Sequence, residues 1–267
     1  MQNRLAKSES HAVTTIIPYI AGSKDSQFQT ARTIPFNNMR KFDPNITAPT
    51  PDFFYGANSS QIDPRVRNDI GEYIIPSRRT SVPAAPNYFR ADKSASGRAD
   101  VAQMQAMYDG AVGARGMHTL QNYGTATPVY DNNTYTISST YHPGTGTLQM
   151  YATHPAPPAS RGGETQYYTT QLDSYAMTGN MNGFRSGATA YRNGREWARE
   201  QRDRFIASAN AAAQRPSTET RSLGRDEDTN VSSDTEEESP NSETSADELA
   251  LDYKSSVKRQ RGRGNSS

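Results

Sequence analysis

The sequence predicts an α/β or α+β fold, with one domain whose small central mixed sheet is flanked by helices. Runs rich in aromatic residues alternate with segments of helical spacing along residues 1–215, which favours mixed architecture. Only 33% of the 267 residues are hydrophobic and the mean hydropathy is -0.88, which predicts one modest core. From residue 216 onward large apolar side chains become rare, so residues 216–267 are predicted to form a disordered tail.

The first elements follow from local patterns. A helix leading into an extended segment is expected over residues 5–20, followed by a long loop through residue 45. The stretch "PTPDFFYGA", residues 49–57, predicts a short strand, because proline favours extended backbone in the residue before it. Residues 64–73 predict a short helix with Pro64 in its first turn.

The second half of the domain continues this alternation. "PNYFRADK", residues 86–93, predicts a strand, and residues 100–115 predict a helix because Val101, Met104, Tyr108 and Val112 recur at helical spacing. "NTYTISSTYHPGTGTLQMYATH", residues 133–154, predicts two strands joined by a tight turn. A long closing helix is expected over residues 184–215.

Composition limits the chemistry that the chain can perform. It has no cysteine, which excludes disulfides and zinc–thiolate sites, and its four histidines lack paired-ligand spacing, so a metal would have to be bound by oxygen. The first residues resemble no signal peptide, and no segment approaches the roughly 18 apolar residues of a membrane span. We therefore expect a nuclear or cytoplasmic protein that is neither secreted nor membrane-bound.

Charge is segregated along the chain. Residues 219–252 carry 12 acids and 2 bases, residues 254–263 carry 5 bases, and residues 1–218 carry 22 bases and 16 acids. The acidic tail could recruit basic protein partners. Its basic end, with Lys258, Arg259, Arg261 and Arg263, is typical of a nuclear localisation or nucleic-acid-binding cluster, although it could also be only solvated charge.

Asp52 and Lys93 form a candidate pair for metal-dependent phosphodiester hydrolysis. This reaction needs carboxylates to hold Mg²⁺ and a lysine to orient water or offset developing charge. Side chains alternate along a strand, so positions 91 and 93 should face one way and Asp92 the other. Position 91 is alanine, so Asp92 could join Lys93 only if a bulge or the strand end redirected it.

Several segments in order, among them "IIPYIAG", "PTPDFFYGA", "VPAAPNYFRADK" and "AMYDGAVGARGMHTLQNYG", resemble a family of uncharacterised fungal proteins. The core of that family looks like the PD-(D/E)xK, or restriction-endonuclease-like, nuclease fold. The resemblance implies Mg²⁺ or Mn²⁺ as cofactor, Asp52 as the acid of the "PD" element, Lys93 as the signature lysine and Gln105 as a polar helper. It also implies Glu9 as the acid of the first helix. Ala91 departs from the pattern, so that either Asp92 substitutes as metal ligand or the site is degenerate.

Each of these residues also has an ordinary structural interpretation. Asp52 could be a turn or cap residue, Lys93 a solvated side chain and Gln105 a helix-surface amide. Four arginines on one face of the last helix could contact phosphates of nucleic acid; these are Arg192, Arg195, Arg199 and Arg202. Acidic residues within a turn of them make a salt-bridged, solvated face the alternative.

The function expected from these features is a metal-dependent nuclease-like domain that acts on nucleic acid, with activity reduced or lost because of Ala91. The alternative is a non-catalytic module that binds nucleic acid or protein and recruits partners through its acidic tail.

Overall fold

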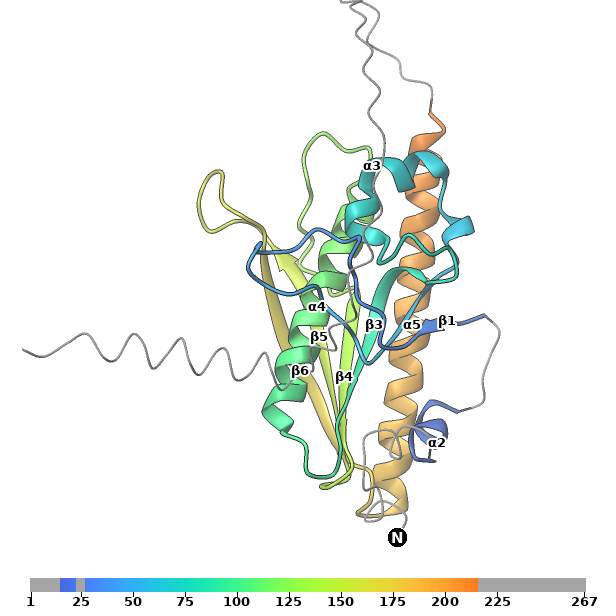
Figure 1. The fold of residues 1–267 in the computed structure, drawn as a ribbon, viewed down its shortest axis with the longest axis vertical. Coiled ribbons are helices and arrows are strands. Elements are labelled where there is room, and N and C mark those ends of the chain that lie inside the picture. The colour runs from blue at the N-terminus through green and yellow to red at the C-terminus, as the bar shows by residue number, and fades with distance from the viewer. Residues whose placement is uncertain (1–14, 23–26, 216–267) are drawn as a thin grey trace, which may run out of the picture. The chain divides into compact units, whose positions relative to one another are not determined.

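The computed structural model describes residues 15–22 and 27–215. They form an α+β domain built on a six-stranded mixed sheet flanked by helices (Figure 1), which confirms the predicted mixed architecture. All of them except Arg215 belong to a compact unit that ends at Gln214. Among the described residues, no helix combines the length and apolar character needed to cross a bilayer.

The strands lie in the sheet in their chain order, and only one neighbouring pair is parallel. That pair is β3 and β4, which are joined through helix α4; the other neighbours are antiparallel. In chain order the elements are α2 (Ile17–Ala21), β1 (Gln29–Ala31), β2 (Phe53–Ala57), the 3-10 helix η2 (Ser59–Gln61), α3 (Pro64–Ile74), β3 (Ala84–Asp92), α4 (Ala99–Gln121), β4 (Thr136–His142), β5 (Thr147–Ala156), β6 (Gln166–Ala176) and α5 (Met181–Ala213).

Capping residues set where two of the helices begin. The Asp63 side chain accepts a hydrogen bond of 2.9 Å from the Arg65 amide, and Pro64 occupies the first turn of α3. The Asn180 side chain accepts a 2.8 Å bond from the Gly183 amide at the start of α5. These side chains satisfy amides that have no partner within the helix, so local sequence defines both starts.

Helices cover the central strands from both sides. All nine residues of β3 are buried, because α4 and α5 run along opposite sides of the sheet (Figure 1). Tyr88 packs toward α5 against Tyr191, whereas its neighbour Phe89 packs toward α4 with Phe54 and Val112. The alternation of side chains along β3 therefore separates an α4 face from an α5 face.

Most of the predicted elements are confirmed, with three exceptions. The strands at residues 49–57 and 86–93, the hairpin of β4 and β5, and the helices predicted over residues 64–73, 100–115 and 184–215 are all present. Strand β1 was not predicted, because it lies in the loop expected through residue 45. The helix expected from residue 5 falls largely on residues outside the described part of the chain. The extended segment expected before residue 20 is wrong, because residues 17–21 form α2 with Pro18 in its first turn. Strand β6 was not predicted, since it is mostly exposed and its sequence lacks apolar alternation.

Small residues let α4 lie close to the sheet. A Cβ atom on Gly113 would be 2.5 Å from the Phe89 ring and 3.0 Å from the Pro86 carbonyl oxygen. At Gly110 it would be 2.6 Å from the Thr153 hydroxyl oxygen. The separation between helix and sheet thus depends on the absence of side chains at these two positions.

We predict opposite effects of alanine at two helical glycines. Gly113→Ala should lower the free energy of unfolding by about 1–3 kcal/mol, because the new methyl group overpacks the α4 face. Gly71→Ala is the control: its Cβ would meet nothing closer than 3.6 Å, and the higher helix propensity of alanine should stabilise α3 by up to about 1 kcal/mol. Urea unfolding of both variants measures the difference, and similar stabilities would contradict the close packing of α4.

Candidate functional site

The antiparallel pairing of β2 and β3 brings Asp52 to the end of β3. Asp52 directly precedes β2, Lys93 directly follows β3, and Phe53 pairs with Arg90 in the register. One carboxylate oxygen of Asp52 accepts a 2.8 Å hydrogen bond from the Asp92 amide, 40 residues away in the sequence. This bond holds the Asp52 carboxylate beside the point where β3 ends.

Lys93 and Gln105 complete a polar cluster on the α4 face. The Lys93 ammonium donates to the Gln105 side-chain oxygen at 3.4 Å, and Lys93 is only 8% exposed. Gln105 also lies near enough to Asp52 to lower the pKa of that carboxyl group. Three residues that the sequence singled out, Asp52, Lys93 and Gln105, are therefore gathered at one place by β2, β3 and α4.

Burial controls the acidity of Asp52. It raises the pKa of the carboxyl group above its ordinary value of 3.8, because the charged form loses contact with water. The positive charge of Lys93 acts in the opposite direction, whereas the negative charge of Asp92 raises the pKa further. The hydrogen bond from the Asp92 amide and the nearby Gln105 side chain lower the pKa without reversing the net shift. A cation placed here would relieve the carboxylate of its poor solvation.

Asp92 lies on the α5 face and does not join this cluster. Its two carboxylate oxygens accept hydrogen bonds from Arg90 at 2.7 and 2.9 Å, and both side chains are 2% exposed. Arg90 also donates to the Tyr191 hydroxyl at 3.1 Å. Burial disfavours the charged guanidinium, but the Asp92 carboxylate outweighs it and raises the pKa of Arg90. The Asp92 carboxylate is thus bound to Arg90 on the opposite face from Lys93, and the structure does not bring it together with Asp52 and Lys93.

Position 91, where the resemblance led us to expect an acid, is filled by packing. Ala91 is 1% exposed and lies in an apolar cluster with Ala102, Ala106 and Tyr151. A glutamate or aspartate side chain would have to displace α4 or the tyrosine ring. The surroundings of Ala91 therefore leave no room for an acidic side chain.

Asp109 is a second buried carboxylate on the α4 face, and the sequence reasoning missed it. It lies one helical turn after Gln105, is 1% exposed, and one of its carboxylate oxygens has no hydrogen-bond partner. Burial raises the pKa of Asp109 well above the ordinary 3.8; Asp52 raises it further, and Lys93 opposes the shift. Its spacing of four residues from Gln105 was the signal that could have identified it.

Two arginines of the predicted phosphate-binding stripe cap helix α2. Arg192 donates to the carbonyl oxygens of Ile20, at 2.9 Å, and Tyr19, at 2.8 Å. Arg195 donates to the Ala21 carbonyl at 3.0 Å and lies over the Phe28 ring, 4.1 Å from its centroid. These guanidinium groups donate hydrogen bonds to the carbonyls at the end of α2, which have no partner within that helix.

The other two arginines of the stripe bind groups within the domain. Arg199 pairs with Glu196 and, at 3.2 Å, with Asp203. Arg202 is 2% exposed and donates to the Asn87 side-chain oxygen at 3.1 Å, and burial lowers its pKa to about 10. The ion pairs of Arg199 match the salt-bridged face that was the alternative, and all four guanidinium groups have partners within the domain.

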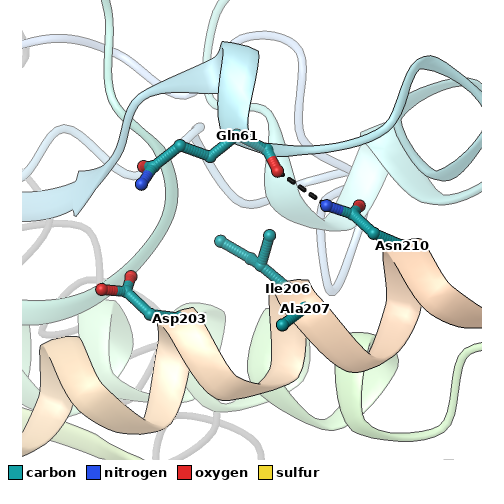
Figure 2. A pocket seen from close by; sticks show the side chains of 5 residues that line it. All are labelled: Gln61, Asp203, Ile206, Ala207 and Asn210. Atoms are coloured by element: carbon teal, nitrogen blue, oxygen red, sulfur yellow. Dashed lines mark hydrogen bonds between the residues drawn. The ribbon is translucent and has the colours of Figure 1, made fainter.

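A hollow of about 200 Å³ lies between η2 and α5 (Figure 2). Asn210 donates to the Gln61 carbonyl oxygen at 2.8 Å across it. The residues that line it are Gln61, Asp203, Ile206, Ala207 and Asn210. None of the candidate metal or catalytic residues is among them.

Glu9 and the basic cluster of Lys258, Arg259, Arg261 and Arg263 lie outside the described residues. Within residues 15–22 and 27–215, no three His, Cys, Asp or Glu side chains form a group that could hold a metal ion. Comparison of the chain with protein-family models, curated proteins and solved structures finds no match in any of the three.

We predict that Asp92→Asn destabilises the domain regardless of metal, because it leaves Arg90 buried without its counter-charge. The free energy of unfolding should fall by about 3–5 kcal/mol. Asp100→Asn is the matched control: its partner is Arg98, both side chains are exposed, and solvent screening should leave the free energy of unfolding nearly unchanged. Equal urea midpoints for the two variants would contradict a structural role for the Arg90–Asp92 pair.

We also predict a pH dependence of stability from Asp109, measured in EDTA. Because its folded-state pKa is raised, the folded protein binds more protons than the unfolded chain, so stability falls as pH rises from about 4 toward the folded pKa. The slope from one such group reaches about 1.4 kcal/mol per pH unit. Asp109→Asn should flatten the curve. An unchanged slope in urea unfolding between pH 4 and 8 would show that Asp109 does not titrate in a buried state.

Proposed function

We propose that this domain is restriction-endonuclease-like and hydrolyses phosphodiester bonds of nucleic acid with a divalent metal ion. The observation that carries the proposal is the gathering of Asp52, Lys93 and Gln105 at the adjacent ends of β2 and β3, against α4. The excess of bases over acids in residues 1–218, 22 against 16, favours a polyanionic substrate.

The residues at the site fit a hard cation. Mg²⁺ and Mn²⁺ prefer carboxylate oxygens, and Mg²⁺ is often held by only one or two of them, with water and substrate phosphate completing the shell. The half-buried Asp52 carboxylate has one oxygen tied to the Asp92 amide, and a buried carboxylate oxygen without a partner lies nearby on α4. Poorly solvated carboxylates of this kind gain from a cation, which supports the proposed metal dependence.

Each side chain then has a distinct task. Asp52 would hold the cation, which when bound polarises the phosphate and activates water. Lys93 carries the positive charge that orients the attacking water and offsets the charge that develops on the phosphate. Gln105 accepts a hydrogen bond from the Lys93 ammonium and keeps it at the end of β3. Asp52 and Gln105 are both partly exposed, so phosphate would approach the cluster from their side.

The packing at Ala91 favours a second candidate, a non-catalytic module of the same fold that binds nucleic acid or protein. Alanine stands at position 91, where the family signature has an acid, and the Asp92 carboxylate is ion-paired with Arg90. Under this alternative, Asp52 and Lys93 form a structural polar cluster. Binding of nucleic acid without cleavage at any metal concentration would identify this case.

The test is cleavage of single- and double-stranded DNA and RNA with Mg²⁺ or Mn²⁺. We expect wild-type cleavage to fall by about 100-fold or more in Asp52→Asn and in Lys93→Met, because each removes charge stabilisation at the phosphate. Asp100→Asn, an exposed acid at the start of α4, should cleave like wild type. Circular dichroism confirms that each variant is folded. Cleavage that survives loss of both Asp52 and Lys93 would reject the proposed site.

A further inference from the structure

Asp109 is a buried acid that the roles of Asp52, Lys93 and Gln105 leave unexplained. It is 1% exposed, and one carboxylate oxygen has no hydrogen-bond partner. Buried carboxylates in folded proteins are normally paired or hydrogen-bonded, because removing one from water is costly. The unpartnered oxygen of Asp109 is therefore a place where a cation or a hydrogen-bond donor could bind.

The local charge balance points to the kind of group. Asp52 and Lys93 are the charged residues that act on Asp109, one raising and the other lowering its pKa. Lys93 is thus the cation whose charge acts on both carboxylates, and both are poorly solvated. A divalent cation would compensate both acids, whereas another lysine or arginine is not available among the described groups that act on Asp109.

The geometry of the strands and α4 explains why the second acid comes from a helix. Position 91 is closed by Ala102, Ala106 and Tyr151, and Asp92 faces α5. Helix α4, in contrast, brings Gln105 within hydrogen-bonding distance of Lys93, at 3.4 Å. Asp109 lies one helical turn after Gln105 on the same face of α4, which places it beside the cluster.

We propose that Asp109 is the second carboxylate ligand of a divalent cation, Mg²⁺ or Mn²⁺, whose first ligand is Asp52. It takes the place of the acid that is absent at Ala91, so the site is relocated rather than lost. This inference rests on the proposed function for its metal, but it concerns a residue that neither the sequence pattern nor the family signature assigns. Water and a substrate phosphate would fill the remaining coordination positions.

The test is a titration of the full-length protein with Mn²⁺. Binding is measured by calorimetry and, independently, by the electron paramagnetic resonance signal of free Mn²⁺. We expect one site in wild type and at least about tenfold weaker binding in Asp109→Asn and in Asp52→Asn. Asp100→Asn, an exposed acid on the same helix, should bind Mn²⁺ like wild type. Wild-type affinity in folded Asp109→Asn would overturn the proposal. Asp109→Ser, which also removes the charge, replaces Asn if that variant does not fold.

Measuring cleavage on the same samples separates the two proposals. If Mn²⁺ binding requires Asp52 and Asp109 but no nucleic acid is cleaved, Asp109 is supported as a ligand and the nuclease activity is rejected. Cleavage that needs Asp52 and Lys93 but persists in Asp109→Asn, together with unchanged Mn²⁺ affinity, would keep the nuclease and reject Asp109 as a ligand.

Discussion

The close approach of α4 to the sheet is the constraint on which the candidate site depends. At Gly110 and Gly113 a single Cβ atom would come within 2.6 and 2.5 Å of Thr153 and Phe89, so the helix lies at a distance that larger residues forbid. This proximity brings Gln105 within hydrogen-bonding distance of Lys93 and places Asp109 where Asp52 and Lys93 act on it. It also fills the space beside Ala91. The same packing that removes one acid position thus makes another available on the helix.

Strand β3 divides two electrostatic environments that share a backbone. On the α5 side, Arg90 and Asp92 neutralise each other in a bidentate pair and need nothing further. On the α4 side, the charge of Lys93 acts on two acids, Asp52 and Asp109, and lowers the pKa of each. Because buried charge is tolerated when it is paired, the first environment is structural, and the second is the one that we propose binds a cation. The Asp92 residue links them, since its amide holds Asp52 while its carboxylate holds Arg90.

Much of this arrangement follows from the sequence, and the exceptions have physical causes. Alternation along a strand correctly separates Asp92 from Lys93. The inward face of α4 is harder to identify, because it is built from alanine and glycine: the pattern of Val101, Met104, Tyr108 and Val112 includes Met104, which is 47% exposed. An acid within a face of small residues carries no apolar signal, so Asp109 escaped notice. The arginine stripe likewise has a regular spacing, but only tertiary structure reveals that α2 and Asn87 occupy its guanidinium groups.

The central claim is that Asp52 and Asp109 together hold a divalent cation beside Lys93. The most direct measurement is the anomalous difference density of crystals grown with Mn²⁺. The account predicts one peak about 2 Å from a carboxylate oxygen of each aspartate, next to the Lys93 ammonium. If neither carboxylate binds an ion at saturating Mn²⁺, the claim is contradicted. The cluster would then be a buried polar network that only stabilises the fold.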